Sequence, residues 1–249
     1  MRARVDARDA ARIALAVRTA PRVVLELSEP LPAEPAALAA GLRRMAWERH
    51  LPAGLSWAVR SVGRSARFRH TGYTSRWVKD QIRARFAAVR AVAPPVDSRA
   101  PDVLVDLRLM NESAHVGLHL GRGSLHRRAV PRHAAAPLRE DVAAGLAWLA
   151  DVHHNRPMVD PFCGSGTLIA EAVAVARRVP PDRDLALLAR LAVFADVNLE
   201  WIARELVDDA LPMTAPVIAA DRDRTSIEQT RDRLRRMRLA DVVDVQQSN

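Results

Sequence analysis

The first half of the chain alternates between stretches with a two-residue hydrophobic period and stretches with helical spacing. The two-residue period predicts strands, and apolar residues three or four positions apart predict helices. The last two strands are separated by the turn 110–113, which predicts a hairpin. This order predicts a small α+β module. The predicted strands are 22–27, 55–62, 102–109 and 114–120, and the predicted helices are 8–20, 36–47 and 75–89.

The second half has a different order, in which short apolar strands alternate with amphipathic helices. This order is typical of a parallel sheet flanked by helices, and it predicts an α/β domain. A long, mostly helical stretch separates its first two strands. We place the domain boundary so that the domains are 1–133 and 134–249. The first two predicted strands end at Asp160 and Asp221, and the third spans 242–245. A predicted helix follows the first strand and is broken at Pro180; its expected buried face is Leu168, Ile169, Ala172, Val173 and Ala176. The other predicted helices are 137–150, 185–191, 197–210 and 225–239.

Composition narrows the classes of function. The 249 residues carry a formal net charge of +9, which favours a polyanionic partner. Lys79 is the only lysine, so the arginine excess also reflects a general codon bias. The single cysteine, Cys163, excludes an internal disulfide and a site built from several cysteines. No long apolar run or signal core is present, so we expect a cytoplasmic protein that does not enter a membrane.

Metal binding is not predicted. The histidines lack the helical i, i+4 spacing backed by a third ligand that zinc sites use, and surface histidines are the simpler interpretation. The residues considered are His126, His133, His153 and His154.

The most informative stretch is the glycine loop that links the strand ending at Asp160 to the next helix. Gly164 and Gly166 permit positive φ, and we expect Ser165 and Thr167 to cap the helix. No Gly-Lys-Ser/Thr follows, so this is not a phosphate loop, and the third glycine of the dinucleotide motif is missing. An acidic residue before the glycines suits a cationic ligand such as an ammonium or a sulfonium. The alternative is a plain turn without a ligand.

The segment Asp-Pro-Phe-Cys-Gly-Ser-Gly-Thr, residues 160–167, resembles motif I of the S-adenosylmethionine-dependent RNA methyltransferases that carry a THUMP domain. It is most similar to the guanine-N2 methyltransferases among them. Segments 73–82, 100–103 and 125–128 also resemble that family. The resemblance implies a ferredoxin-like/THUMP RNA-binding region at 1–133. It implies the N-terminal half of a Rossmann-like S-adenosylmethionine-binding domain at 134–249.

The resemblance also implies site residues. A carboxylate at the end of the second strand accepts hydrogen bonds from ribose hydroxyls, which favours Asp221 over Asp223 as a cofactor ligand. The implied cofactor-binding residues are Asp160, Pro161, Cys163, Gly164, Gly166, Thr167, Asp221 and Asn249. The implied RNA-binding residues are Arg76, Lys79, Arg127 and Arg128. Cys163 is not expected to act as a nucleophile.

The implied activity is methyl transfer from S-adenosylmethionine to an exocyclic guanine nitrogen in ribosomal or transfer RNA. The family's catalytic motif, Asn-Pro-Pro followed by an aromatic residue, does not occur in the sequence, so no catalytic residue is predicted. The family usually also opens with several tens of residues that complete the N-terminal module, so we expect a fragment that is truncated at both ends. A degenerate gene product is the alternative. One alternative is a catalytically inactive THUMP module that binds RNA. Another is a DNA amino-methyltransferase, against which the THUMP-like segments argue.

Overall fold

The computed structural model describes residues 2–122, 125 and 138–248 and divides the chain into two compact units. The predicted boundary at 133 and 134 lies outside the described residues and stays a prediction. The first unit comprises Met1–Ala14, Arg22–Gly123 and Asp184–Leu199, and the second comprises Leu15–Pro21, Ser124–Arg183 and Glu200–Asn249. Each unit therefore includes a short segment from the opposite half of the sequence.

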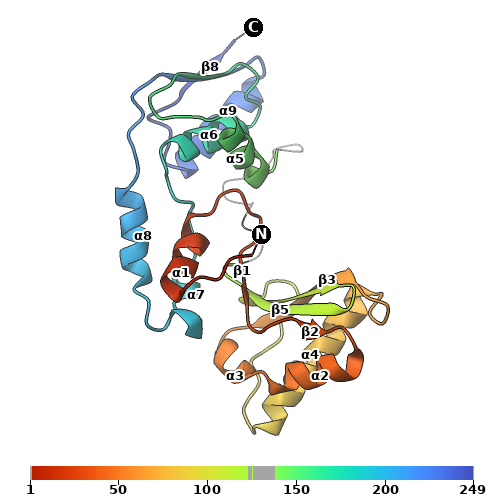
Figure 1. Cartoon of the computed structure of the whole chain (residues 1–249). Coiled ribbons are helices and arrows are strands. Elements are labelled where there is room, and N and C mark those ends of the chain that lie inside the picture. The colour runs from red at the N-terminus through yellow and green to blue at the C-terminus, as the bar shows by residue number, and fades with distance from the viewer. Residues whose placement is uncertain (1, 123–124, 126–137, 249) are drawn as a thin grey trace. The chain divides into compact units, whose positions relative to one another are not determined.

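The described residues of the first unit contain a five-stranded mixed sheet (Figure 1). Its order is β1-β5-β4-β3, and β2 also pairs with β5. The β3–β4 pair is parallel, and the pairs that involve β5 are antiparallel. The strands are β1 (Val24–Glu26), β2 (Leu31–Pro32), β3 (Trp57–Arg64), β4 (Val103–Met110) and β5 (Ser113–His119). Apart from the very short β2, which was not predicted, the ends of each strand lie within two or three residues of the predicted ones.

Helix α4 (Thr71–Ala88) connects the parallel strands β3 and β4 and packs against β3, with α2 (Pro35–Arg44) beside it (Figure 1). A helical crossover is what a parallel pair requires. The predicted inward positions Val78, Ile82 and Phe86 are all buried. This unit also contains most of α1 (Ala7–Ala16) and the short segments α3 (Trp47–His50), α7 (Leu185–Leu188) and η1 (Ala192–Phe194).

The predicted hairpin is confirmed. Strands β4 and β5 pair antiparallel with Met110 opposite Ser113, which leaves a two-residue turn. Asn111 has φ of 56°, a left-handed conformation that asparagine tolerates better than most residues.

The described residues of the second unit contain a three-stranded parallel sheet in the order β6-β7-β8. The predicted α/β arrangement is therefore confirmed. The strands are β6 (Met158–Asp160), β7 (Val217–Asp221) and β8 (Asp244–Gln247), and the helices are α5 (Glu140–Leu149), α6 (Thr167–Ala176), α8 (Leu199–Asp208) and α9 (Arg224–Arg236). Strand β8 starts two residues later than predicted. Val243 is buried in the core ahead of the strand, so its hydrophobicity reflects packing of the preceding turn.

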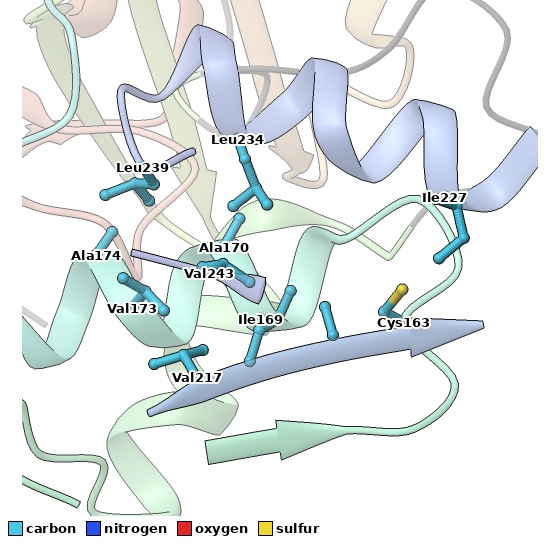
Figure 2. Packing of buried hydrophobic residues seen from close by; sticks show 11 residues of the cluster. Cys163, Ile169, Ala170, Val173, Ala174, Val217, Ile227, Leu234, Leu239 and Val243 are labelled. Carbon is cyan, nitrogen blue, oxygen red and sulfur yellow. The ribbon is translucent and has the colours of Figure 1, made fainter. Parts of the chain in front are cut away.

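The core of this unit forms where α6 and α9 cover β7 (Figure 2). Ile169 and Val173 of α6 and Leu234 of α9 point toward the strand, where Val217 lies (Figure 2). Leu168, which we predicted on the buried face, is 39% exposed. The buried stripe of α6 is completed by Ala170, Ala172, Ala174 and Ala176, whose small side chains allow close packing.

The predicted helix 8–20 is too long, because α1 ends at Ala16 (Ala7–Ala16). Beyond it, Arg18 is buried and donates from Nε to Oε2 of Glu171 at 3.0 Å and from Nη1 to the carbonyl of Val179 at 2.9 Å. A local helical pattern carried no information about these distant partners. The predicted helices 185–191 and 197–210 correspond to α7 and α8, and the short η1 lies between them.

Gly63 provides a test of the first sheet. Its φ is +80°, and a Cβ atom there would lie 2.2 Å from the carbonyl oxygen of Leu109 on β4. We expect Gly63→Ala to lower the free energy of unfolding by about 1–3 kcal/mol, because strain and the backbone clash act together. Urea unfolding followed by circular dichroism measures the change.

Gly72→Ala is the matched control. Nothing lies within 4 Å of a Cβ at this position in α4. Alanine is favoured over glycine in helices, so this variant should be as stable as the parent or more stable. Equal unfolding midpoints for the two variants would contradict the assigned backbone at Gly63.

Candidate functional site

The glycine loop runs from Asp160, the last residue of β6, to Thr167, the first residue of α6. Gly164 and Gly166 have φ of +52° and +73°, as predicted. At Gly166 a Cβ atom would also lie 2.8 Å from Cγ2 of Thr230. Glycine is therefore required at Gly166 both for its conformation and for the close approach of α9.

The predicted capping of α6 is wrong. Gly166 is the N-cap residue, and among the described residues no side-chain hydrogen bond caps this start of the helix. The hydroxyls of Ser165 and Thr167 instead lie 3.5 Å from each other. The first amides of a helix have no partner within the helix and carry partial positive charge. This end of α6 therefore suits a negatively charged ligand group.

Hydrogen bonds join the loop to the end of β7. The N–H of Cys163 donates to the carbonyl of Ala220 at 2.9 Å, and the N–H of Gly164 donates to Oδ2 of Asp221 at 2.9 Å. Asp221 also accepts the N–H of Asp223 through Oδ1 at 2.9 Å. Asp221 is thus tied to the loop, and the N-cap of α9 is Asp223, which accepts the N–H of Ser226 at 2.8 Å.

The carboxylates of Asp160 and Asp221 lie at the same edge of the sheet, because the carboxyl ends of the parallel strands β6 and β7 lie side by side. Burial is the main cause that raises the pKa of Asp160, and the charge of Asp221 adds to it. The N–H of Phe162, 3.3 Å from Oδ1 of Asp160, acts in the opposite direction. A cationic ligand beside Asp160 would relieve this unfavourable environment.

Cys163 does not have the properties of a nucleophile. Its side chain belongs to the hydrophobic core, and burial raises the pKa of its thiol. The neutral thiol lies 3.6 Å from Oγ1 of Thr230. Catalytic cysteines have the opposite property, a lowered pKa in a positive environment.

Thr230 and Arg233 on α9 were missed by the sequence interpretation, although both contact the loop. Oγ1 of Thr230 donates to the carbonyl of Gly164, and Nε of Arg233 donates to the carbonyl of Ser165, each at 2.8 Å. Both residues lie on the helix face marked by the buried Ile227 and Leu234. The sequence signal that could have identified them is the presence of polar residues on an otherwise apolar helix face.

The structure brings most of the predicted cofactor residues together. Those at the loop and the end of β7 are Asp160, Pro161, Cys163, Gly164, Gly166, Thr167 and Asp221. Asn249 lies outside the described residues.

The predicted RNA-binding residues of the first unit lie on α4. Arg76 is exposed and Lys79 is partly exposed. Arg127 and Arg128 lie outside the described residues. Of the nearby aromatic rings, Tyr73 is 54% exposed, whereas Phe68 is buried and packs 5.0 Å from the ring centre of Trp77. Aromatic rings among basic residues in 68–77 are compatible with either base stacking or core packing, and Phe68 is a core residue.

A hollow of about 410 Å³ lies in the first unit between β3 and the first turns of α4. Arg60 and Arg99 supply its positive charge, and Asp106 lies 3.9 Å from Arg60. Its hydroxyl groups belong to Ser61, Thr71, Ser75 and Ser98. Guanidinium groups together with hydroxyls suit a phosphate.

The described residues contain no group of three or more His, Cys, Asp or Glu side chains arranged to hold a metal ion. Within the same residues, no helix has the length and apolar character needed to cross a membrane.

The raised pKa of Asp160 gives a stability test with a definite sign. The folded state favours the protonated acid, so the contribution of this group to stability is greatest below the ordinary carboxyl pKa and falls as the pH rises through the raised value. At pH 7 we expect Asp160→Asn to raise the free energy of unfolding by up to about 1 kcal/mol. The gain should vanish below about pH 4 in urea titrations.

Asp223→Asn is a control of opposite sign. The hydrogen bond from the Ser226 amide is the main cause that lowers the pKa of Asp223. Removing this charge should cost stability at neutral pH, and the cost should disappear as the pH falls through the lowered pKa. A pH-independent effect at Asp160 would show that its environment does not disfavour the charge.

Two family matches cover most of the chain. Residues 33–119 match the THUMP domain, and residues 127–249 match the family described as "RMKL-like, methyltransferase domain". A protein of Chromohalobacter salexigens named ribosomal RNA large subunit methyltransferase K/L is 40% identical over 185 residues, which cover 72% of this chain and 25% of that protein. Its namesake from Methylococcus capsulatus is 31% identical over 94% of this chain and 33% of that protein. The chain thus spans a quarter to a third of the length of these relatives.

A solved structure described as a methyltransferase complexed with SAH superimposes with a TM-score of 0.78. It is 24% identical, and the match covers 96% of this chain and 64% of that chain. At this level of identity the likeness shows the fold. The family matches and the named relatives agree with it. The chain belongs to the family of THUMP-containing, RMKL-like methyltransferases.

Proposed function

We propose that the second unit binds S-adenosylmethionine and that the protein to which it belongs methylates the exocyclic N2 of guanine in ribosomal or transfer RNA. The observation that carries the proposal is the glycine loop of β6 and α6, with the carboxylates of Asp160 and Asp221 at one edge of the parallel sheet. The relatives' names support ribosomal RNA as the substrate class.

The charged and polar groups of the site fit S-adenosylmethionine. Asp160 has an environment that disfavours its own negative charge and so favours a cationic group beside it. Asp221, at the end of β7, has the position from which a carboxylate accepts ribose hydroxyls. The uncapped start of α6 suits a carboxylate. Ammonium, ribose and carboxylate groups all occur in S-adenosylmethionine.

The role we propose for the residues of this chain is to bind and orient S-adenosylmethionine. When bound, S-adenosylmethionine supplies a methyl group activated by a sulfonium. Asp160, Asp221 and the loop hold the donor in one orientation, which lowers the entropic barrier to an in-line transfer. The buried, neutral Cys163 takes no covalent part.

We assign RNA binding to the first unit. Arg76, Lys79 and the exposed ring of Tyr73 lie on α4, and the basic hollow lies beside the same helix. Phosphate contacts from basic side chains and stacking on aromatic rings are the usual means of RNA recognition.

A second candidate function is binding without turnover. The 249 residues contain no Asn-Pro-Pro, the motif that the family resemblance associates with catalysis. For these residues alone, binding of cofactor and RNA is therefore the function we propose, and the transfer step is proposed for the whole protein.

Asp160→Asn tests the cofactor proposal. We expect calorimetry to show a loss of S-adenosylmethionine affinity of about tenfold to a hundredfold, the range for a lost hydrogen bond to a charged group. The same variant should be more stable without ligand at neutral pH, so unfolding cannot explain the loss. Asp241→Asn, an exposed carboxylate of the same unit, is the control. Unchanged affinity in Asp160→Asn would refute the assigned cofactor site.

The double change Arg76→Ala and Lys79→Ala tests the RNA proposal. Binding to structured RNA should weaken, and the slope of log K against log salt should fall by about two phosphate contacts. Changing Arg224 and Arg236 of α9 to alanine removes the same charge elsewhere and should leave the slope nearly unaltered. Equal slopes in all three proteins would mean that this face of α4 is turned away from RNA.

A further inference from the structure

Arg233 is fully buried in the second unit, which is unusual for an arginine. Its Nη1 donates to Oε1 of Glu140 at 2.6 Å, and Glu140 is itself 1% exposed. Its Nε donates to the carbonyl of Ser165 at 2.8 Å. One guanidinium therefore links the start of α5, the glycine loop and α9.

Thr230 lies one turn earlier on the same face of α9. Its hydroxyl donates to the carbonyl of Gly164 at 2.8 Å, and its Cγ2 would meet a Cβ at Gly166 at the same distance. Two consecutive carbonyls of the loop, those of Gly164 and Ser165, thus point to side chains of α9. The missing side chain at Gly166 is what lets the helix approach.

These contacts also determine where the loop amides point. A trans peptide unit is planar, and its carbonyl and N–H point in opposite directions. With the carbonyl of Gly164 bound to Thr230, the N–H of Ser165 points away from α9. With the carbonyl of Ser165 bound to Arg233, the N–H of Gly166 points the other way and donates to the carbonyl of Cys163 at 2.8 Å.

Stability alone is a weak reason for this arrangement. A buried ion pair is often no more stabilising than apolar residues of similar size, because both charges lose their hydration. Within the described part of the chain, Nη2 of Arg233 is buried without a hydrogen-bond partner, which adds a cost. The guanidinium instead holds the Ser165 carbonyl of the glycine loop in one orientation, as Thr230 does for the carbonyl of Gly164.

We propose that Arg233, with Thr230, is a positioning residue that orients the glycine loop before the cofactor binds. The proposal deepens the proposed function and rests on it for the identity of the ligand. Neither side chain needs to contact the cofactor. Both act through hydrogen bonds to the carbonyls of Gly164 and Ser165. These bonds fix the conformation of the loop in advance and so reduce the conformational entropy that the loop loses on binding.

The test uses Arg233→Met and Thr230→Val in the 249-residue chain. Both keep much of the side-chain shape and remove the hydrogen bond to the loop. Arg235→Met, on the exposed face of the same helix, is the matched control. The ligand is S-adenosylhomocysteine, whose affinity is measured by calorimetry. Amide hydrogen exchange of the segment 160–168 is measured without ligand.

We expect Arg233→Met to weaken binding about tenfold to a hundredfold and Thr230→Val about twofold to tenfold. In both, exchange should accelerate in the loop while β7 and α9 remain protected. A purely structural role would instead raise exchange throughout the unit. Binding within twofold of the parent for both variants, or loop exchange equal to the parent, would overturn the proposal.

The two proposals can fail separately. If the parent chain binds no S-adenosylhomocysteine, the proposed function fails, and the exchange measurement still decides whether α9 orients the loop. If Arg233→Met does not fold, Thr230→Val decides the outcome, because valine replaces threonine with little change in shape.

Discussion

The parallel pairing of β6 with β7 is the constraint on which the second unit depends. It places the carboxyl ends of both strands at one edge, so Asp160 and Asp221 approach although 60 residues separate them in the sequence. The loop between β6 and α6 then bonds to β7 through the amides of Cys163 and Gly164. Without that pairing, the glycine loop would have no second strand to hold it and no second carboxylate beside it.

Two groups at this site lower the stability of the protein without ligand. Asp160 is half-buried near a second carboxylate, and its pKa rises as a result. Arg233 is buried with one nitrogen lacking a partner among the described residues. Both arrangements cost free energy in the protein without ligand, and sites that bind ligands commonly carry such costs. The same unit has a hydrophobic core to which α6, α9 and β7 contribute (Figure 2).

The first unit uses a different chemistry. Its mixed sheet and helix α4 present arginine, lysine, tyrosine and hydroxyl side chains, which fit a phosphate backbone and exposed bases. The chain thus combines an acidic edge suited to a cationic cofactor with a basic face suited to a nucleic acid. These opposite charges lie on separate compact units.

The sequence by itself determined the α+β and α/β organisation, the hairpin at Asn111 and the positive φ of Gly164 and Gly166. These features depend on local periodicity and on the conformational freedom of single residues. The tertiary structure alone decided that Arg18 lies outside the helix and contacts Glu171, and that the N-cap of α6 is Gly166. It also decided that Thr230 and Arg233 hold the loop. The contacts of Arg18, Thr230 and Arg233 depend on partners distant in sequence, and a local pattern carries no information about such partners.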